Sequence, residues 1–215
     1  WTLSPKSFRI IRSKMVELSK SGFKSETPDH DYLATAFHLG DWLVAQPEGT
    51  HTFSEQQLRR VPSDIWPEWI PRSDLHRPDG YSLCNSRAGK SVVAFETEIS
   101  SKGTDRYQRH VTYYDAETTV RFVFWLVDSV GRLNSIRKSF AKHGVRNWSK
   151  HHFMLLKDFN ACGWSARFIE GEFKRHSLID ILSYNGATLP LHRGCSCSAL
   201  KLLDIRKRPR DSEPS

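Results

Sequence analysis

Apolar residues change their spacing several times along the 215-residue chain, and this spacing predicts its elements. Near the start, Phe8, Ile11 and Met15 recur at helical intervals, which predicts an amphipathic helix over residues 4–20. The other faces of this helix are strongly basic. A second, mostly apolar stretch predicts another helix over residues 31–45.

In the middle of the chain the period shortens to that of β-strands. Short strands are expected over residues 51–58, 77–85 and 91–99, and a loop rich in Pro and Trp is expected over 59–77. Residues 119–127 form the most apolar run, and it is rich in aromatic and β-branched residues. Such a run is typical of a strand that is buried on both faces of a sheet.

Helices are expected over residues 104–116 and 131–143, and a short strand over 152–157. The order is therefore helix, three strands, helix, strand, and then a further helix and strand. This order predicts an α/β fold with a mixed central sheet flanked by helices. The expected organisation is a helical segment over 1–30, an α/β domain over 31–205 and a disordered basic tail over 206–215.

Acidic residues occur on the third predicted strand, where a buried strand would carry apolar ones. Side chains alternate along a strand, so Glu96 and Glu98 are expected on one face, with Asp79 reaching them from the preceding strand. Three converging carboxylates suit Mg²⁺ or Mn²⁺, which would activate a water for attack on a phosphodiester. Either Glu98 or Lys102 is expected to position that water. The alternative is an edge strand whose carboxylates are simply solvated.

This arrangement resembles the PD-(D/E)XK, or restriction-endonuclease-like, superfamily. Pro78-Asp79, a hairpin and then Glu96-Thr97 match the two halves of its motif. Glu98 departs from the Lys that is usual at this position, which puts the usual water-activating role in doubt. The resemblance covers about residues 31–127 and implies a metal-dependent nuclease core.

A narrower similarity covers more of the chain. The first six residues look like the end of a winged-helix wing that runs into a helix. Later motifs follow in the order His30-Asp31, Ser54-Glu55-x-x-Leu58-Arg59, Arg77-Pro78-Asp79-Gly80, Glu96-x-Glu98, Arg106-Tyr107 and Tyr114. This set is similar to bacterial replication-relaxation and plasmid mobilisation-type proteins. It implies a DNA context, with a winged-helix part before a nuclease-like domain.

The formal net charge of +8 favours acidic partners, chiefly nucleic acid. Residues 132–157 contain seven Lys or Arg and no Asp or Glu. Phosphate or base contacts are therefore expected from Arg106, Arg137, Lys138, Lys142, Arg146, Trp148 and Lys150. The alternative is a solvated helix face on which Trp148 is a packing residue.

Three residues of the helix over 104–116, Tyr107, Val111 and Tyr114, have the spacing of a buried face. His151 and His152 are adjacent strand residues that face opposite ways, so they are not expected to ligate one zinc ion. Glu55 is expected to be solvated or salt-bridged, and the alternative is that it adds a further carboxylate to the site from the first strand.

The sequence thus predicts a Mg²⁺-dependent DNA endonuclease or nicking protein of a mobile element. The second hypothesis is a DNA-binding accessory protein on a nuclease-like scaffold that no longer cuts. A third, a protein-interaction domain, depends on exposure of Trp66 and Trp69. A cytoplasmic location with reduced cysteines is expected, without a membrane span, and possible assemblies are a homodimer or a larger mobilisation or transposition complex.

Overall fold

The computed structural model describes residues 28–43, 46, 48–86, 89–100 and 104–182. The predicted helix over 4–20, the winged-helix-like start, Lys102 and the tail over 206–215 lie outside the described residues. Helix α2 begins at Pro28, three residues before the predicted domain boundary. Among the described residues, no helix is both long and apolar enough to cross a membrane.

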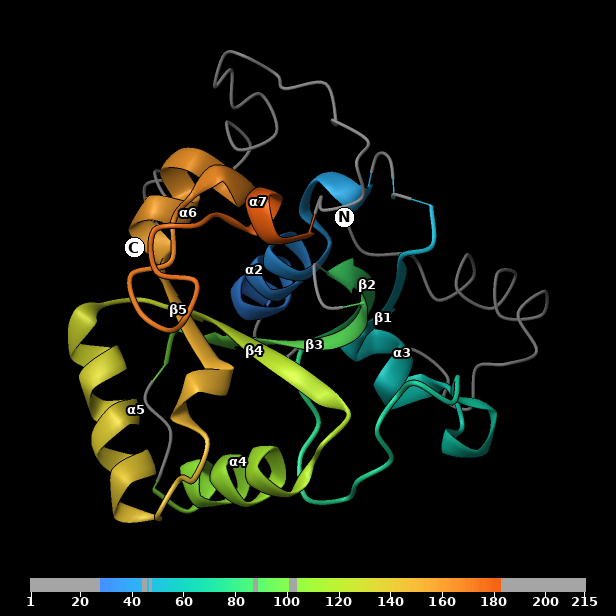
Figure 1. Ribbon diagram of the computed structural model, residues 1–215, viewed down its shortest axis with the longest axis horizontal. Helices are drawn as coiled ribbons and strands as arrows, with labels where there is room; N and C mark the ends of the chain where they lie inside the picture. The colour runs from blue at the N-terminus through green and yellow to red at the C-terminus, as the bar shows by residue number, and fades with distance from the viewer. Residues whose placement is uncertain (1–27, 44–45, 47, 87–88, 101–103, 183–215) are drawn as a thin grey trace, which may run out of the picture.

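Five strands form one mixed sheet in the order β1-β2-β3-β4-β5 (Figure 1). The pairs β1/β2 and β2/β3 are antiparallel, whereas β3/β4 and β4/β5 are parallel. The strands are β1 (His51–Ser54), β2 (Gly80–Ser86), β3 (Gly89–Glu98), β4 (Val120–Val127) and β5 (His151–Leu155).

Helices cover both faces of this sheet. The helices are α2 (Pro28–Leu39), α3 (Glu55–Arg60), α4 (Thr104–Ala116), α5 (Val130–Lys142), α6 (Leu156–Cys162) and α7 (Leu178–Leu182), with 3-10 segments η1 (Gly40–Leu43), η2 (Ser63–Ile65), η3 (Trp148–Lys150) and η4 (Gly163–Ser165). Figure 1 shows α4 and α5 below and to the left of the sheet, and α2, α6 and α7 above it. The two crossovers between parallel strands, through α4 and α5, therefore cover the same face. The predicted α/β architecture is confirmed, and the predicted elements follow in the expected order except that α3 lies between β1 and β2.

The side chains of β4 supply both cores. Val123, Trp125 and Val127 belong to the cluster shared with α4 and α5, and Phe124 and Leu126 to the cluster shared with α2, α6 and α7. All five are 0% exposed. This is why the strand lacks a polar–apolar alternation, and the prediction of a strand buried on both faces is confirmed.

Two local predictions are wrong. The strand expected over 51–58 ends at Ser54, because the Ser54 side chain accepts a bond from the Gln57 amide and the Gln57 side chain accepts one from the Ser54 amide. This capping box begins α3. The exposure expected of Trp66 is also wrong, since its ring is buried and its Nε1 donates to the Val61 carbonyl at 2.9 Å.

Three of the buried histidines, His38, His151 and His152, have strongly lowered pKa values. Burial lowers the pKa of His38 to about 4 and those of His151 and His152 to about 3, so all three are neutral at pH 7. His151 accepts from the Trp125 indole at 3.0 Å on the α4/α5 side, whereas His152 packs against Phe173 on the opposite side. The prediction that the adjacent pair faces opposite ways is confirmed.

These histidines predict an acid-sensitive fold. The unfolded chain takes up their protons near its ordinary pKa of about 6.5, whereas the folded chain resists protonation down to pH 4 or 3. The stabilisation is complete above pH 6.5 and is lost as the pH falls, by about 2 kcal/mol per histidine between pH 7 and pH 5. Urea unfolding measured across this range checks it, and His152→Gln should make the pH dependence shallower. A free energy of unfolding that stays constant from pH 7 to pH 5 would contradict the prediction.

Candidate metal site and arginine cleft

Asp79 stands just before β2 and is held by three hydrogen bonds. Its amide donates to the Phe95 carbonyl at 3.0 Å, and its Oδ2 accepts from the Thr97 amide at 2.6 Å. Its carbonyl accepts from the Glu55 amide at 2.9 Å, at the start of α3. Asp79 therefore connects the beginning of β2, the end of β3 and the first turn of α3.

Two further ligand-type side chains meet Asp79. His30, in the first turn of α2, donates from Nε2 to the Thr97 carbonyl at 3.0 Å and lies 3.7 Å from Asp79 Oδ2. Glu55 forms an ion pair with Arg59 one turn later on α3. Ligand atoms of His30, Glu55 and Asp79 all lie within 4.8 Å of one another, and their side chains are 17%, 12% and 9% exposed. We call these three residues the Asp79 cluster.

Gly80, the residue after Asp79, allows α2 to approach the sheet. A Cβ at position 80 would lie 2.2 Å from Nδ1 of His38. The His38 ring has no room to retreat, because it is bonded to the Tyr81 carbonyl at 3.0 Å and packed on Phe95 with ring centroids 4.9 Å apart. The glycine of the Pro-Asp-Gly motif therefore sets the distance of α2, and with it the position of His30.

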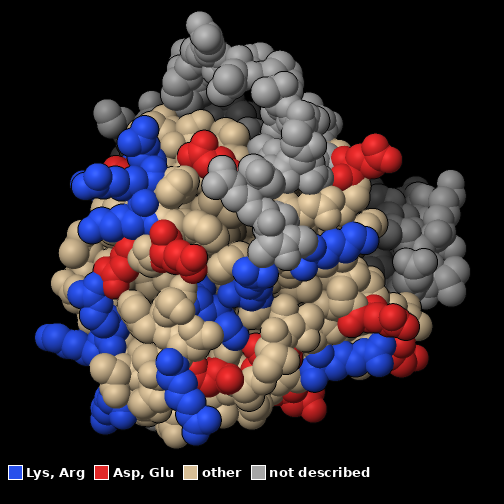
Figure 2. Space-filling model, viewed as in Figure 1, with Lys and Arg blue, Asp and Glu red and all other residues tan. Residues whose placement is uncertain are grey.

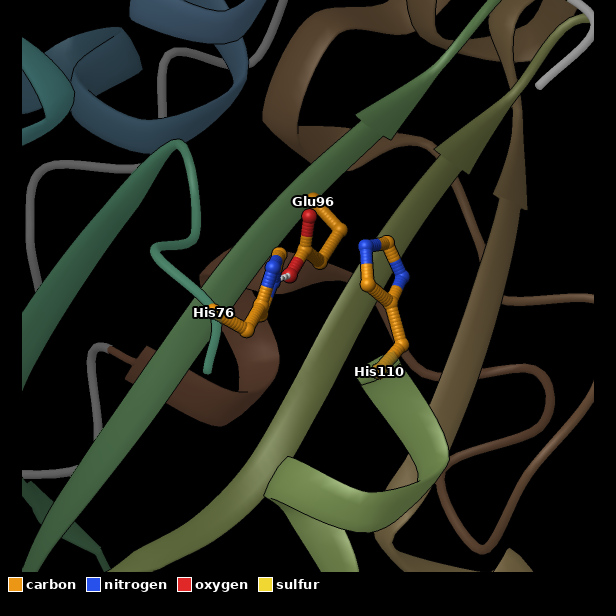
Figure 3. A group of neighbouring side chains, drawn as sticks. All are labelled: His76, Glu96 and His110. Atoms are coloured by element: carbon orange, nitrogen blue, oxygen red, sulfur yellow. Dashed lines mark hydrogen bonds and ion pairs between the residues drawn. The ribbon is translucent and has the colours of Figure 1, made fainter. Parts of the chain in front are cut away.

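Glu96 belongs to a second cluster on the other face of β3. Its carboxylate accepts hydrogen bonds from Nε2 of His76 and from the Tyr114 hydroxyl. His110 of α4 completes a group whose ligand atoms lie within 4.8 Å of one another. Figure 3 shows His76 and His110 converging on Glu96, and their rings are 4.0 Å apart between centroids. We call His76, Glu96 and His110 the Glu96 cluster.

Burial alone would raise the pKa of Glu96. The charge of His76 and its hydrogen bond, the charge of His110 and the bond from Tyr114 outweigh burial and lower that pKa to about 2. Glu96 is thus a buried carboxylate, 3% exposed, that stays ionised because its neighbours stabilise the charge.

Glu98 is also buried, at 1% exposed, on the same side of β3 as Glu96. Its charge acts on Tyr107 of α4 and Arg132 of α5. Burial and then the charge of Glu98 raise the pKa of Tyr107 to about 12. Tyr107, Val111 and Tyr114 form the buried face of α4, as predicted.

The structure therefore places the three predicted carboxylates in two separate environments. Within the residues it describes, no group of ligand-type side chains holds both Asp79 and Glu96. Asp79 turns toward α2 and α3, whereas Glu96 and Glu98 face α4 and α5. The fourth predicted residue, Lys102, lies outside the described residues.

A polar cleft of about 310 Å³ lies beside the Glu96 cluster. Most of the residues that line it are three arginines (Arg77, Arg106 and Arg109), two histidines (His76 and His110) and a single acid, Asp74. We call it the arginine cleft. The loop before β2 contributes one wall and α4 the other. Arg106, predicted to contact nucleic acid, is one of these residues and is exposed.

The other residues of the predicted phosphate surface have different environments. Lys150 is 8% exposed and its Nζ donates to the carbonyls of Tyr114 at 2.7 Å and Glu117 at 2.8 Å, so the prediction that Lys150 contacts phosphate is wrong. Trp148 stacks on Phe153 with centroids 5.4 Å apart and is a packing residue.

Fewer residues of the predicted phosphate surface are exposed cations than the sequence indicated. Arg137 is exposed but forms an ion pair with Glu170. Lys138, Lys142 and Arg146 are exposed cations on and after α5. Figure 2 shows many Lys and Arg side chains along the edge of the molecule that carries α5, at the left of the view.

His76 and His110 were not predicted as site residues. His110 lies at the spacing of the buried face of α4, three residues after Tyr107 and four before Tyr114, and a histidine on such a face could have drawn attention. His76 lies in irregular chain before β2, where no periodic pattern points inward.

Neither a scan of protein-family models nor searches of curated proteins and of solved structures gave a match for this chain. The two family resemblances therefore stay predictions, and the geometry of the site carries the functional argument.

We predict that Gly80→Ala destabilises the protein, by about 1–3 kcal/mol, because the added methyl group overpacks the buried His38 ring. Urea unfolding measures this. The control is Gly131→Ala in α5, where the nearest atom to a new Cβ is Ser129 Oγ at 3.6 Å and alanine improves helix propensity. Equal effects of the two substitutions would contradict the close approach of α2.

Proposed function

We propose that this chain is a metal-dependent phosphodiesterase that acts on DNA, with a divalent cation bound by His30, Glu55 and Asp79. The observation that carries the proposal is the convergence of these residues. They come from three motifs that are 25 and 24 residues apart in the sequence, and their ligand atoms lie within 4.8 Å of one another. These are the first three motifs of the resemblance to mobilisation-type proteins.

The chemistry of the donors fits such a cation. Two carboxylates and one imidazole supply negative charge and three ligand atoms, and their partial exposure leaves room for substrate oxygen or water. When bound, the cation would activate a water and neutralise charge on the phosphate. Both Mg²⁺ and Mn²⁺ were predicted from carboxylates alone, and the imidazole favours Mn²⁺ of the two.

The backbone of Thr97 orients two residues of the Asp79 cluster. The Thr97 amide fixes Oδ2 of Asp79. The Thr97 carbonyl accepts from Nε2 of His30, which is also the nitrogen 3.7 Å from Asp79 Oδ2, so ligation through Nε2 requires that bond to be exchanged. Hydrogen bonds of this kind orient metal ligands and tune their basicity.

The fold supports a restriction-endonuclease-like core. A helix, three antiparallel strands, a helix and a fourth strand parallel to the third occur in the order that the resemblance implies. Asp79 begins the second strand of that series, and Glu96 lies on the third. The departure from the family is that Glu96 and Glu98 are enclosed by α4 and α5, so neither is proposed as a catalytic residue.

The second candidate is a DNA-binding accessory protein that does not cut. It is favoured by the partners that the carboxylates already have: Glu96 is bonded by His76 and Tyr114, and Glu55 is paired with Arg59. In both candidates DNA is held by exposed cations, for which Lys138, Lys142 and Arg146 are the best placed.

Asp79→Asn is the test of the metal site. The asparagine oxygen can still accept from the Thr97 amide, so the fold should be kept while a ligand charge is lost. We expect Mn²⁺ affinity, measured by calorimetry, and Mn²⁺-dependent cleavage of plasmid DNA to fall by about 100-fold or more.

The matched control is Asp64→Asn, the same change at an exposed carboxylate in η2, which should leave both quantities unchanged. Cleavage by Asp79→Asn at the wild-type rate would end the catalytic proposal. Wild-type DNA binding with neither Mn²⁺ binding nor cleavage would favour the accessory protein instead.

DNA affinity should fall steeply with salt, by roughly 0.9 log units per contacted phosphate for each tenfold rise in salt concentration. Lys142→Ala combined with Arg146→Ala should reduce that slope by about two contacts and weaken different sequences about equally. Fluorescence anisotropy with two unrelated duplexes measures it.

Lys150→Ala tests whether the buried lysine contributes to DNA binding. It should leave the salt slope unchanged and lower the free energy of unfolding by about 1–3 kcal/mol, because two carbonyls lose their donor. The phosphate surface would be misplaced if Lys150→Ala reduced the salt slope. It would also be misplaced if the double variant Lys142→Ala/Arg146→Ala left the slope unchanged.

A further inference from the structure

The arginine cleft lies on the α4 side of β3, apart from the Asp79 cluster. Arg106 and Arg109 are three residues apart on α4, and Arg77 comes from the loop before β2. Among the residues that line the cleft, Asp74 is the sole acid. The cleft therefore concentrates three fixed positive charges in a space of about 310 Å³.

The Glu96 cluster beside this cleft has the ligand types of a cation site, but the charge around it favours an anion. A divalent cation bound there would be repelled by the guanidinium groups of the three arginines that line the cleft. Glu96, the carboxylate that would have to bind it, already accepts bonds from His76 and Tyr114. An anion in the cleft would instead meet the three arginines.

We propose that the arginine cleft is a phosphate-binding site, in which Arg77, Arg106 and Arg109 bind the phosphate oxygens and His76 is a further donor. Glu96 is the positioning residue for His76, because it accepts from Nε2 and so fixes the imidazole plane. Nδ1 is the other nitrogen of that ring, and it donates to a phosphate oxygen when the imidazole carries a proton on both nitrogens.

The number and type of donors indicate phosphate rather than carboxylate. Each guanidinium offers a planar pair of N–H donors that matches two oxygens of one anion. A phosphate group has enough oxygens to accept from three arginines at once, whereas a carboxylate has two. The volume of the cleft admits a phosphate together with part of the molecule that carries it. That molecule is either a small phosphate compound or a nucleic-acid strand.

This inference does not require cleavage, because the cleft shares no residue with the Asp79 cluster. Asp79→Asn should therefore bind phosphate as the wild type does when divalent cations are removed with chelator. Failure of the metal site and failure of the phosphate site are thus distinguishable in the same preparations.

Inorganic phosphate, titrated calorimetrically into the full chain, is the first test. We expect saturable binding that weakens about tenfold or more in Arg109→Gln and in Arg106→Gln. The control is Arg121→Gln, which replaces an exposed arginine on β4 outside the cleft, and it should bind as the wild type does. Non-saturable heats, or equal affinities in all four proteins, would overturn the proposal.

Two oligonucleotides, identical except for a 5′-phosphate or a 5′-hydroxyl, distinguish the sources of the phosphate. Inorganic phosphate should displace both if the cleft binds a backbone phosphate, and the 5′-phosphorylated strand alone if it binds a strand end. Inorganic phosphate that binds without displacing either strand indicates a small phosphate compound.

Cobalt(II) tests the competing cation site directly. We expect no spectroscopic change that depends on the Glu96 cluster when Co²⁺ is added to Asp79→Asn. Ligand-field bands that appear in Asp79→Asn and vanish on the further change His110→Gln would assign the cluster to a metal and overturn the phosphate proposal.

Discussion

The arrangement of both clusters depends on the hydrogen bonds of Asp79. Its amide and its carboxylate bond to β3 on either side of Glu96, at the Phe95 carbonyl and the Thr97 amide, and its carbonyl receives the Glu55 amide. One residue thereby sets the start of β2, the end of the β2/β3 pairing and the first turn of α3. Because Asp79 is engaged by backbone groups, its side chain is fixed in place. The charge that it presents toward His30 and Glu55 is consequently preorganised.

The alternation of β3 explains why the acidic residues divide into two environments. Glu96 and Glu98 are two residues apart and share the α4/α5 face, whereas Thr97 between them offers its backbone to Asp79 and His30 on the other side. A buried carboxylate is costly unless it is bonded, and His76 and Tyr114 supply the bonds that keep Glu96 ionised. Because Glu96 is held by these bonds, it does not join Asp79 as a ligand for a cation. The structure thus holds two clusters of carboxylate and histidine in place of the one three-carboxylate site that was predicted.

Much of the fold follows from periodicity, whereas the site does not. The apolar run before Asp128 and the spacing of Tyr107 and Tyr114 identified a doubly covered strand and the buried face of a helix, because both signals arise from residues close in sequence. The capping box at Ser54 was missed although its residues are local, because residues 51–58 were predicted as one short strand. His76 could not be placed, because its position depends on an irregular loop folding against α4. The convergence of His30 with Asp79 depends on how closely α2 approaches Gly80, which is a matter of tertiary packing that no spacing encodes.

The structure shows which cations have internal partners, which composition alone could not reveal. The net charge of +8 predicted acidic partners, but it could not say which cations are committed internally. Lys150 stabilises the end of α4, and Arg137 is paired with Glu170, so neither adds freely to a phosphate surface. Arg77, Arg106 and Arg109 instead line one cleft in which a single acid opposes them. In the proposed function, the Asp79 cluster supplies anionic ligands for a cation on the α2 side of β3, and the arginine cleft supplies guanidinium groups on the α4 side. That proposal requires both, because the reacting phosphate needs a cation and its neighbours need positive charge.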